Sequence, residues 1–317
     1  MLESNPLPSP EIGTSSDPAH QPASALVVGL MEDGTPSPTL AAINERTDGW
    51  VSRLVREGQV RGKCGELTLL ASPLDSGPTM ILIVGLGDAS PTRTLAFESA
   101  SSAIRKLADR SRKHIIVALA ESFPDSEHDA VIAGAVFGCE SQSIYQSDPS
   151  LEVPGAISFS GVEQTAVQRG IAIGQSINQT RRLVNEPPAV VYPQSFAEMV
   201  RGPAKDAGVT VEIWDEAKLH AEGCRAILAV GAGSTRPPRL VIMRYNGGGS
   251  EPPIALVGKG VTFDSGGLSL KPSDAMADMK CDMAGAATVA GVMYAVARLG
   301  IQQNVIGFCG LAENMVS

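Results

Sequence analysis

The chain has 317 residues, of which 43% are hydrophobic and 19% charged, a composition typical of soluble globular proteins. Its 25 Lys and Arg residues against 34 Asp and Glu residues give a net charge of −9, and only 4% of the residues are aromatic. An acidic chain with few aromatic side chains is a poor candidate for binding nucleic acid, although this composition still allows a local basic patch.

The first part of the chain alternates between strand and helix patterns. Residues 1–24 are rich in Pro and Ser and are predicted to form a disordered tail. Apolar runs predict strands at 25–30, 66–71, 80–85 and 114–120. Helical spacing predicts helices at 40–56, 94–110 and 129–137. This alternation predicts an N-terminal α/β domain over residues 25–160.

A long helix at residues 162–184 opens the second part and ends before Pro187, because proline does not continue a helix. Further helices are expected at 194–207, 216–222 and 284–299. Strands are expected at 209–214, 239–245, 254–258 and 304–309. Residues 161–317 are therefore predicted to form a second α/β domain with a central mixed sheet.

The end of this domain follows a core strand directly, with no further element. We therefore expect the domain to be incomplete at its C-terminal end, with an unpaired sheet edge after residues 304–309. The alternative is a natural terminus that tucks the last strand into the sheet.

Cysteine usage and the N-terminus bear on the compartment. The five cysteines are scattered and none has CxxC spacing, which argues against a disulfide framework and for a reducing environment. The N-terminus has neither the basic nor the apolar region of a secretory signal, and no apolar run reaches the length of a membrane span. We predict a cytoplasmic protein with no membrane partner.

The segment 256–289 carries the most chemistry. It begins at the carboxyl end of a buried strand, where α/β folds place ligands, and contains Lys259, Asp264, Lys271 and Asp282. Carboxylates at such a position suit hard divalent cations, which prefer oxygen ligands.

Each of these residues also has a plainer interpretation. Lys259 could be an exposed turn residue, and Asp264 could cap a turn with the following serine. Asp282 could cap the helix expected at 284–299, or share a solvated helical face with Asp274 and Asp278.

Two strings in this segment resemble the active-site blocks of the leucine aminopeptidase (cytosol aminopeptidase) family of two-metal peptidases. Residues 257–271, VGKGVTFDSGGLSLK, match the first block nearly letter for letter, and residues 282–287, DMAGAA, match the next. Weaker similarity occurs at 183–188, 230–245 and 313–315. The resemblance covers residues 161–317 well, whereas the first domain matches only in its α/β style.

The resemblance implies a metal-dependent aminopeptidase that releases N-terminal amino acids, with a leucine-type preference, from peptides with a free N-terminus. It implies two divalent ions per subunit, Mn²⁺ or Zn²⁺, which activate a water, and it implies a homohexamer. The implied metal ligands are Lys259, Asp264 and Asp282, with Asp264 bridging both ions. Lys271 is the implied catalytic cation, which polarises the scissile carbonyl.

The chain departs from the family in one respect. The remaining metal ligands and a catalytic Arg of the family lie in a downstream Asn-Thr-Asp-Ala-Glu-Gly-Arg block, and this block does not occur before Ser317. The 317-residue chain by itself is therefore expected to be inactive. It would then be an incomplete enzyme or a structural subunit without activity.

A binding module is the alternative from a different class. Its N-terminal domain would take a nucleotide-like ligand, or would bind DNA through a basic cluster. The cluster comprises Arg105, Lys106, Arg110, Arg112 and Lys113. Helical phasing spreads these side chains, so an ordinary solvated surface is the plainer interpretation.

Overall fold

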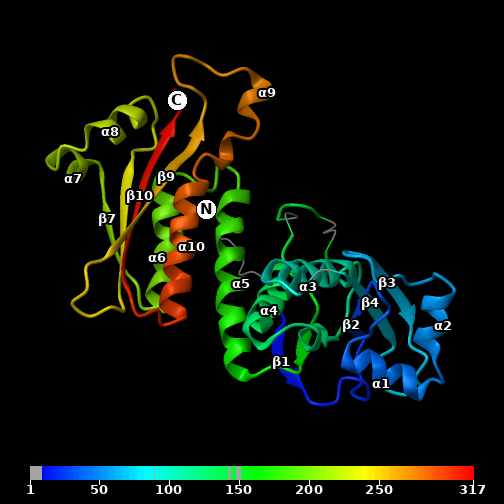
Figure 1. The fold of residues 1–317 in the computed structure, drawn as a ribbon. Helices are drawn as coiled ribbons and strands as arrows, with labels where there is room; N and C mark the ends of the chain where they lie inside the picture. Colours follow the sequence, from blue (N-terminus) through cyan, green and yellow to red (C-terminus); the bar gives the residue numbers. More distant parts are fainter. Residues whose placement is uncertain (1–8, 89, 142–143, 148–150) are drawn as a thin grey trace. The chain divides into compact units, whose positions relative to one another are not determined.

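The computed structural model describes residues 9–88, 90–141, 144–147 and 151–317 (Figure 1). The chain divides into two compact units, one ending at Gln175 and the other spanning Ser176–Ser317. This division falls inside helix α5 (Gln164–Asn185), whereas the sequence pattern predicts a boundary before that helix. The reason is that Val167 packs in the core of the first unit and Leu183 in the core of the second. Among the described residues, no helix is both long and apolar enough to cross a membrane.

A six-stranded sheet with the order β1-β6-β5-β2-β4-β3 forms the centre of the first unit. Its strands are β1 (Glu11–Ser15), β2 (Ala25–Met31), β3 (Leu67–Ala71), β4 (Met80–Gly87), β5 (His114–Val117) and β6 (Ala156–Ser160). Every neighbouring pair is parallel except β3 with β4. A parallel sheet has both faces covered, which explains the unbroken apolar runs of β2 and β4.

Helices pack on both faces of this sheet and complete two cores (Figure 1). These helices are α1 (Pro38–Arg46), α2 (Trp50–Arg56), α3 (Arg93–Leu107) and α4 (His128–Gly138), with 3-10 turns at Leu119–Ser122 and Asp125–Glu127. Val27 of β2 joins the core that contains α3 and α4, whereas its neighbour Leu26 joins the core that contains α1. Alternate strand residues therefore supply different cores, as the predicted α/β class requires.

The prediction of a disordered tail is wrong for residues 9–24. Strand β1 lies in this segment and pairs in parallel with β6 at the edge of the sheet. The sequence pattern missed β1 because Ile12 is its one large apolar residue, so main-chain hydrogen bonds define it more than side-chain burial does. Residues 1–8 of the predicted tail lie outside the described residues.

Two further expectations in the first unit differ from the structure, and one strand was missed. The helix predicted at 40–56 is split into α1 and α2, because Asp48 and Gly49 have φ values of 50° and 80°, a left-handed conformation that ends a helix. The strand predicted at 114–120 ends at Val117. Strand β6, with the alternating Ile157 and Phe159, was not predicted.

A four-stranded mixed sheet with the order β7-β8-β10-β9 forms the centre of the second unit, as predicted. Its strands are β7 (Thr210–Trp214), β8 (Arg239–Asn246), β9 (Ile254–Asp264) and β10 (Asn304–Asn314). Strand β10 runs antiparallel to β8 and parallel to β9. Because β10 therefore lies inside the sheet, the expectation of an unpaired edge at 304–309 is wrong. The edge strands of this sheet are β7 and β9, and Val257 of β9 is 80% exposed.

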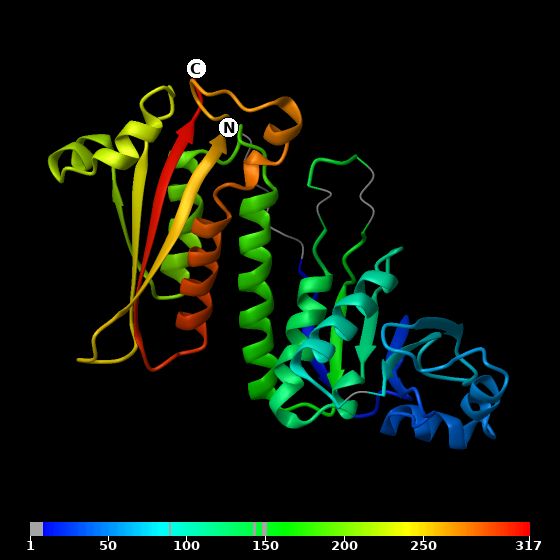
Figure 2. The ribbon, with the colours of Figure 1, turned by 45° about the horizontal axis from the view of Figure 1, so that its top comes forward.

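Helices α6 (Pro193–Asp206) and α10 (Ala284–Arg298) pack against one face of this sheet (Figure 1). The short helices α7 (Glu216–Ala221) and α8 (Arg225–Gly231) follow β7, and α8, which was not predicted, contacts β10. The segment after β9 carries α9 (Ser273–Met276) and a 3-10 turn at Met279–Cys281. It lies at the same end of the sheet as the carboxyl end of β10 (Figure 2). The predicted site residues gather near this end.

Candidate metal centre

Two glycines on β9 let helix α10 approach the strand closely. A Cβ atom at Gly258 would lie 2.5 Å from the carbonyl oxygen of Gly285, and one at Gly260 would lie 3.2 Å from Cβ of Ala286. Any side chain at Gly258 would push the helix away. Because α10 begins at Ala284, this close approach brings Asp282, two residues before the helix, beside β9.

Lys259 lies between these glycines and pairs with Asp282. The Nζ atom of Lys259 is 2.6 Å from Oδ1 of Asp282, and the two side chains are 61% and 18% exposed. The second carboxylate oxygen of Asp282, Oδ2, is buried and has no hydrogen-bond partner among the described residues. A buried oxygen without a partner is costly, and a bound cation would satisfy it. The carboxylate oxygens of Asp282 are thus suited to bind a hard divalent ion.

A β-bulge places Asp264 on the same face of the sheet as Lys259. Lys259 pairs with Gly310 and Asp264 pairs with Asn314, so five steps along β9 correspond to four steps along β10. Thr262 is the extra residue of β9. Paired residues of parallel strands share a face, and four steps on β10 return to the same face. In a regular strand, the odd spacing would have put Lys259 and Asp264 on opposite faces.

The carboxylate of Asp264 is held by three donors. Oδ2 accepts a hydrogen bond from Nζ of Lys271 at 2.6 Å. Oδ1 accepts from the backbone N–H of Gly266 at 3.0 Å and from Nδ2 of Asn314 at 2.6 Å. Burial raises the pKa of Asp264, but these hydrogen bonds outweigh burial, so its pKa lies below the usual value. Asp264 is therefore ionised at neutral pH, as a metal ligand must be.

The four predicted residues thus meet in two ion pairs, Lys259 with Asp282 and Lys271 with Asp264. Over the part of the chain that the structure describes, no group of three or more His, Cys, Asp and Glu side chains converges as a metal site would require. The chain therefore brings together part of the ligands that a metal site needs, namely Lys259, Asp264 and Asp282, which form the donor set.

The plainer interpretations of these residues are mostly not observed. Asp282 does not cap α10, whose N-cap residue is Met283 and has no side-chain cap bond. Asp274 and Asp278 share no helical face with it, because α9 ends at Met276. Lys259 lies within β9 and not in a turn. The turn interpretation is correct for Asp264, whose Oδ1 accepts from Gly266.

Sequence reasoning missed two residues that contact the predicted ones. Met279 places its Sδ atom 3.0 Å from Nζ of Lys271. Asn314 contacts Asp264 from the neighbouring strand, fifty positions later in the chain. The resemblance of residues 313–315 to the family was the one signal for Asn314, and it did not indicate a partner.

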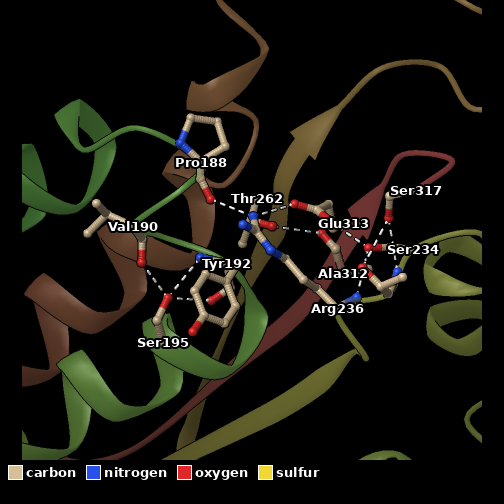
Figure 3. A network of polar contacts seen from close by, with 11 residues as sticks. Pro188, Val190, Tyr192, Ser195, Ser234, Arg236, Thr262, Ala312, Glu313 and Ser317 are labelled. Carbon is tan, nitrogen blue, oxygen red and sulfur yellow. Dashed lines mark hydrogen bonds and ion pairs between the residues drawn. The ribbon is translucent and has the colours of Figure 1, made fainter. Parts of the chain in front are cut away.

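A second polar network lies on the other face of β10, around Glu313 (Figure 3). Glu313 is 4% exposed, and its Oε1 accepts from Nη1 of Arg236 at 2.9 Å. Its Oε2 accepts from Oγ of Ser234 at 2.5 Å. Arg236 also donates to the carbonyl of Pro188 at 2.7 Å and lies 4.6 Å above the ring of Tyr192. Arg236 therefore ties the end of β10 to the segment between α5 and α6.

We expect Arg236→Leu to lower the free energy of unfolding by about 2–3 kcal/mol, because it leaves the Glu313 carboxylate buried without its cation. Arg244→Leu is the matched control. Arg244 pairs with Glu212 at 3.0 Å, but these side chains are 39% and 46% exposed, so we expect a loss below about 1 kcal/mol. Urea denaturation measures both variants. Equal losses would show that the network around Glu313 contributes no special stability.

The basic cluster of the first unit is partly neutralised. Arg112 is buried and donates to Asp109 at 3.0 Å, and Arg110 pairs with the same carboxylate at 3.2 Å. Arg105 lies 4.7 Å above the ring of Phe137. These contacts neutralise two of the five cations and cover a third, which weakens the support that the cluster gives to the binding-module alternative.

Comparison with known proteins accounts for both units. A family model described as "Cytosol aminopeptidase family, N-terminal domain" matches residues 27–149, and one described as "Cytosol aminopeptidase family, catalytic domain" matches residues 178–317. The chain belongs to the cytosol aminopeptidase family. The family resemblance of residues 161–317 is thereby confirmed. It extends to residues 27–149, which the sequence motifs matched only in their α/β pattern.

Curated relatives match almost the whole chain. A protein of Rhodopirellula baltica named "Probable cytosol aminopeptidase" is 50% identical over 100% of the chain, which covers 65% of that protein. A protein of Gluconobacter oxydans with the same name is 38% identical over 95% of the chain, which covers 62% of it. The chain thus spans slightly less than two thirds of the length of these relatives.

Solved structures agree with this assignment. The bottromycin maturation enzyme BotP in complex with Mn matches at a TM-score of 0.76 and 31% identity, over 92% of this chain and 60% of that one. A mutant of tomato leucine aminopeptidase matches at a TM-score of 0.81 over 99% of this chain and 65% of that one. At 24% identity, the tomato protein shows likeness of fold alone.

Proposed function

We propose that the protein is a metal-dependent aminopeptidase that removes N-terminal amino acids, with a leucine-type preference, from peptides with a free N-terminus. The observation that carries this proposal is the donor set on β9 and before α10. Lys259 faces a carboxylate of Asp282 whose second oxygen is buried without a partner, and Asp264 lies on the same face. The names of the family and of the relatives support the reaction class.

Two divalent ions per subunit, Mn²⁺ or Zn²⁺, are the proposed cofactors. Lys259, as a neutral amine that has given up its proton to solvent, and Asp282 would hold one ion, and Asp264 would be shared between both. When bound, the ions supply a water activated for attack and an electrophile for the scissile carbonyl. The Mn in the complex of BotP is consistent with this choice of metal.

Lys271 is the proposed catalytic cation. Its Nζ donates to the carboxylate of Asp264 and, at 3.0 Å, to the main-chain carbonyl of the same residue. These bonds hold the ammonium group at the edge of the donor set. From there it donates a hydrogen bond to the carbonyl oxygen of the substrate as negative charge develops on that oxygen.

The proposed setting is the cytosol, with the protein assembled as a homohexamer. The resemblance to the family supports both statements, and the names of the relatives support the cytosol. Peptides are the proposed substrates, and we propose no nucleic-acid or membrane partner.

The test uses a chimera in which the downstream part of the Rhodopirellula baltica relative continues the chain after Ser317. The family resemblance predicts that this part contains the Asn-Thr-Asp-Ala-Glu-Gly-Arg block. With Mn²⁺ added, we expect the chimera to hydrolyse leucyl-p-nitroanilide and to leave N-acetyl-leucyl-p-nitroanilide intact, because the enzyme needs a free α-amine. Cleavage of both compounds at similar rates would rule out an aminopeptidase. Cleavage of neither, by a chimera that is folded and holds Mn²⁺, would also refute the proposal.

Metal content separates the proposed roles of the two carboxylates. In the chimera, we expect Asp264→Ala to lose both ions and Asp282→Ala to lose mainly one, because a bridging carboxylate serves two cations that otherwise repel each other. Asp274→Ala is the control, since Asp274 is an exposed carboxylate on α9 and should leave both ions bound. Elemental analysis after dialysis measures the content. Equal losses in the Asp264 and Asp282 variants would contradict the bridging role.

A further inference from the structure

The Asp264 carboxylate is bonded to Asn314, a residue for which the family likeness at 313–315 indicated no role. Its Oδ1 oxygen has two donors, the N–H of Gly266 and the side-chain amide of Asn314. The 2.6 Å bond from Asn314 is the shorter of the two. A carboxylate only accepts, so the amide must turn its NH₂ group towards Asp264. The contact is therefore a charge-assisted hydrogen bond of fixed direction.

Asn314 is itself held in place by the loop that follows β9. The main-chain carbonyl oxygen of Asn314 accepts hydrogen bonds from the backbone N–H of Ser265 at 2.9 Å and from Oγ of Ser265 at 2.8 Å. Ser265 is 3% exposed. A Cβ atom at Gly267 would lie 2.9 Å from Oδ1 of Asn314, so the loop closes directly onto the amide group. Asn314 thus has little freedom to release Asp264.

The strand that carries Asn314 is also fixed from its other face. Glu313, the preceding residue, points away from Asp264 because strand residues alternate. Its buried carboxylate is bonded to Arg236 and Ser234. The end of β10 is therefore anchored on both faces at the position where it meets Asp264.

We propose that Asn314 is a positioning residue for the metal centre. It occupies Oδ1 of Asp264 and fixes the plane of the carboxylate, so that Oδ2, which now pairs with Lys271, is the oxygen presented to a cation. This inference rests on the proposed function, because it takes Asp264 to be a metal ligand. Partners that orient metal ligands in this way typically contribute 10–100-fold to metal affinity.

The contact between Asn314 and Asp264 can be measured without metal by a double-mutant cycle. We expect Asn314→Leu to raise the unfolding equilibrium constant about tenfold or more in the wild-type chain, but less than about threefold when Asp264 is alanine. Urea denaturation of the four proteins in EDTA gives these constants. If Asn314→Leu does not fold, Asn314→Ser, which is too short to reach Asp264, replaces it. Additive effects would overturn the inference.

Metal affinity then separates positioning from general stability. Asn304→Leu is the matched control, because Asn304 is a buried asparagine at the other end of β10 that bonds to Gly248, Gly249 and Glu251. In titrations of the 317-residue chain with Mn²⁺ followed by electron paramagnetic resonance, we expect Asn314→Leu to weaken binding about 10–100-fold. Asn304→Leu should destabilise the fold and leave the Mn²⁺ affinity within about twofold.

The two experiments fail in distinguishable ways. If the Mn²⁺ affinity fell equally in the Asn314→Leu and Asn304→Leu variants, the positioning role would be overturned. The loss would then be explained by a general destabilisation of β10. Unchanged Mn²⁺ affinity in Asn314→Leu would overturn it as well. If the wild-type chain binds no Mn²⁺ at all, the metal assignment of the proposed function fails, and the positioning role at the metal centre fails with it. The double-mutant cycle would then still report whether Asn314 orients Asp264.

Discussion

Replacing Lys271 with alanine is expected to lower kcat for leucyl-p-nitroanilide about 10²–10³-fold in the chimera while leaving its Mn²⁺ content unchanged. The loss of rate is the typical effect of removing one donor that stabilises developing negative charge. The metal content should persist because Lys271 pairs with Asp264, and its proposed role is that of a cation and not of a metal ligand. Its removal frees Oδ2 of Asp264 for a metal, so affinity should hold or rise.

Lys280→Ala provides the control for this prediction. Lys280 lies in the same segment, but its Nζ atom donates to the carbonyl of Asn185 and not to a carboxylate of the donor set. We expect its kcat to fall less than about tenfold. Elemental analysis and steady-state kinetics on the same samples decide the outcome. A Lys271 variant that loses its metal in proportion to its rate would show that Lys271 is needed for metal binding, contrary to the proposed role.

Much of the fold could be predicted because buried strands and amphipathic helices have strong patterns. The runs that form β2 and β4 are apolar without interruption, and the helices α3 and α10 lie within a few residues of the predicted bounds. The predictions that failed concern elements that are set by main-chain pairing or main-chain conformation and not by the pattern of apolar side chains. Strand β1 is defined by its pairing with β6, and the break between α1 and α2 depends on a left-handed conformation at Asp48 and Gly49.

For the candidate site, the residues could be predicted from the sequence but their contacts could not. Short motifs with a family likeness identified Lys259, Asp264, Lys271 and Asp282, and the structure brings them into two ion pairs. The pairing itself was not predictable from their spacing. It depends on a bulge in β9 that shifts Asp264 to the face of Lys259, and on an approach of α10 that only the three-dimensional packing reveals.

Contacts between residues far apart in the sequence could not be predicted either, because they depend on how the strands pair. Asn314 meets Asp264 because β9 and β10 run parallel in a particular register, with α10 in the connection between them. The sequence indicated two strands at these places but neither their neighbours nor their order. The same limitation led to the wrong sheet edge, since β10 inserts between β8 and β9.

The 317-residue chain by itself is expected to show no turnover of leucyl-p-nitroanilide, even with excess Mn²⁺ or Zn²⁺. Lys259, Asp264 and Asp282 are the proposed ligands present, and hard cations require several oxygen donors. Among the residues that the structure describes, no further group of acidic, His or Cys side chains converges on them. One weakly bound ion is therefore the expected limit. A single ion does not provide the two-metal arrangement on which the proposed reaction depends.

The comparison is between this chain and the chimera, purified and assayed side by side with the same added metal. We expect turnover from the chimera alone, and Mn²⁺ titration should show one weak site in the chain against two tighter sites in the chimera. The circular dichroism spectrum of the chain must show folded α/β structure, so that inactivity is not caused by unfolding. Comparable turnover by the chain would mean that Lys259, Asp264 and Asp282 suffice for the reaction. The assignment of two metal ions with further ligands would then have to be abandoned.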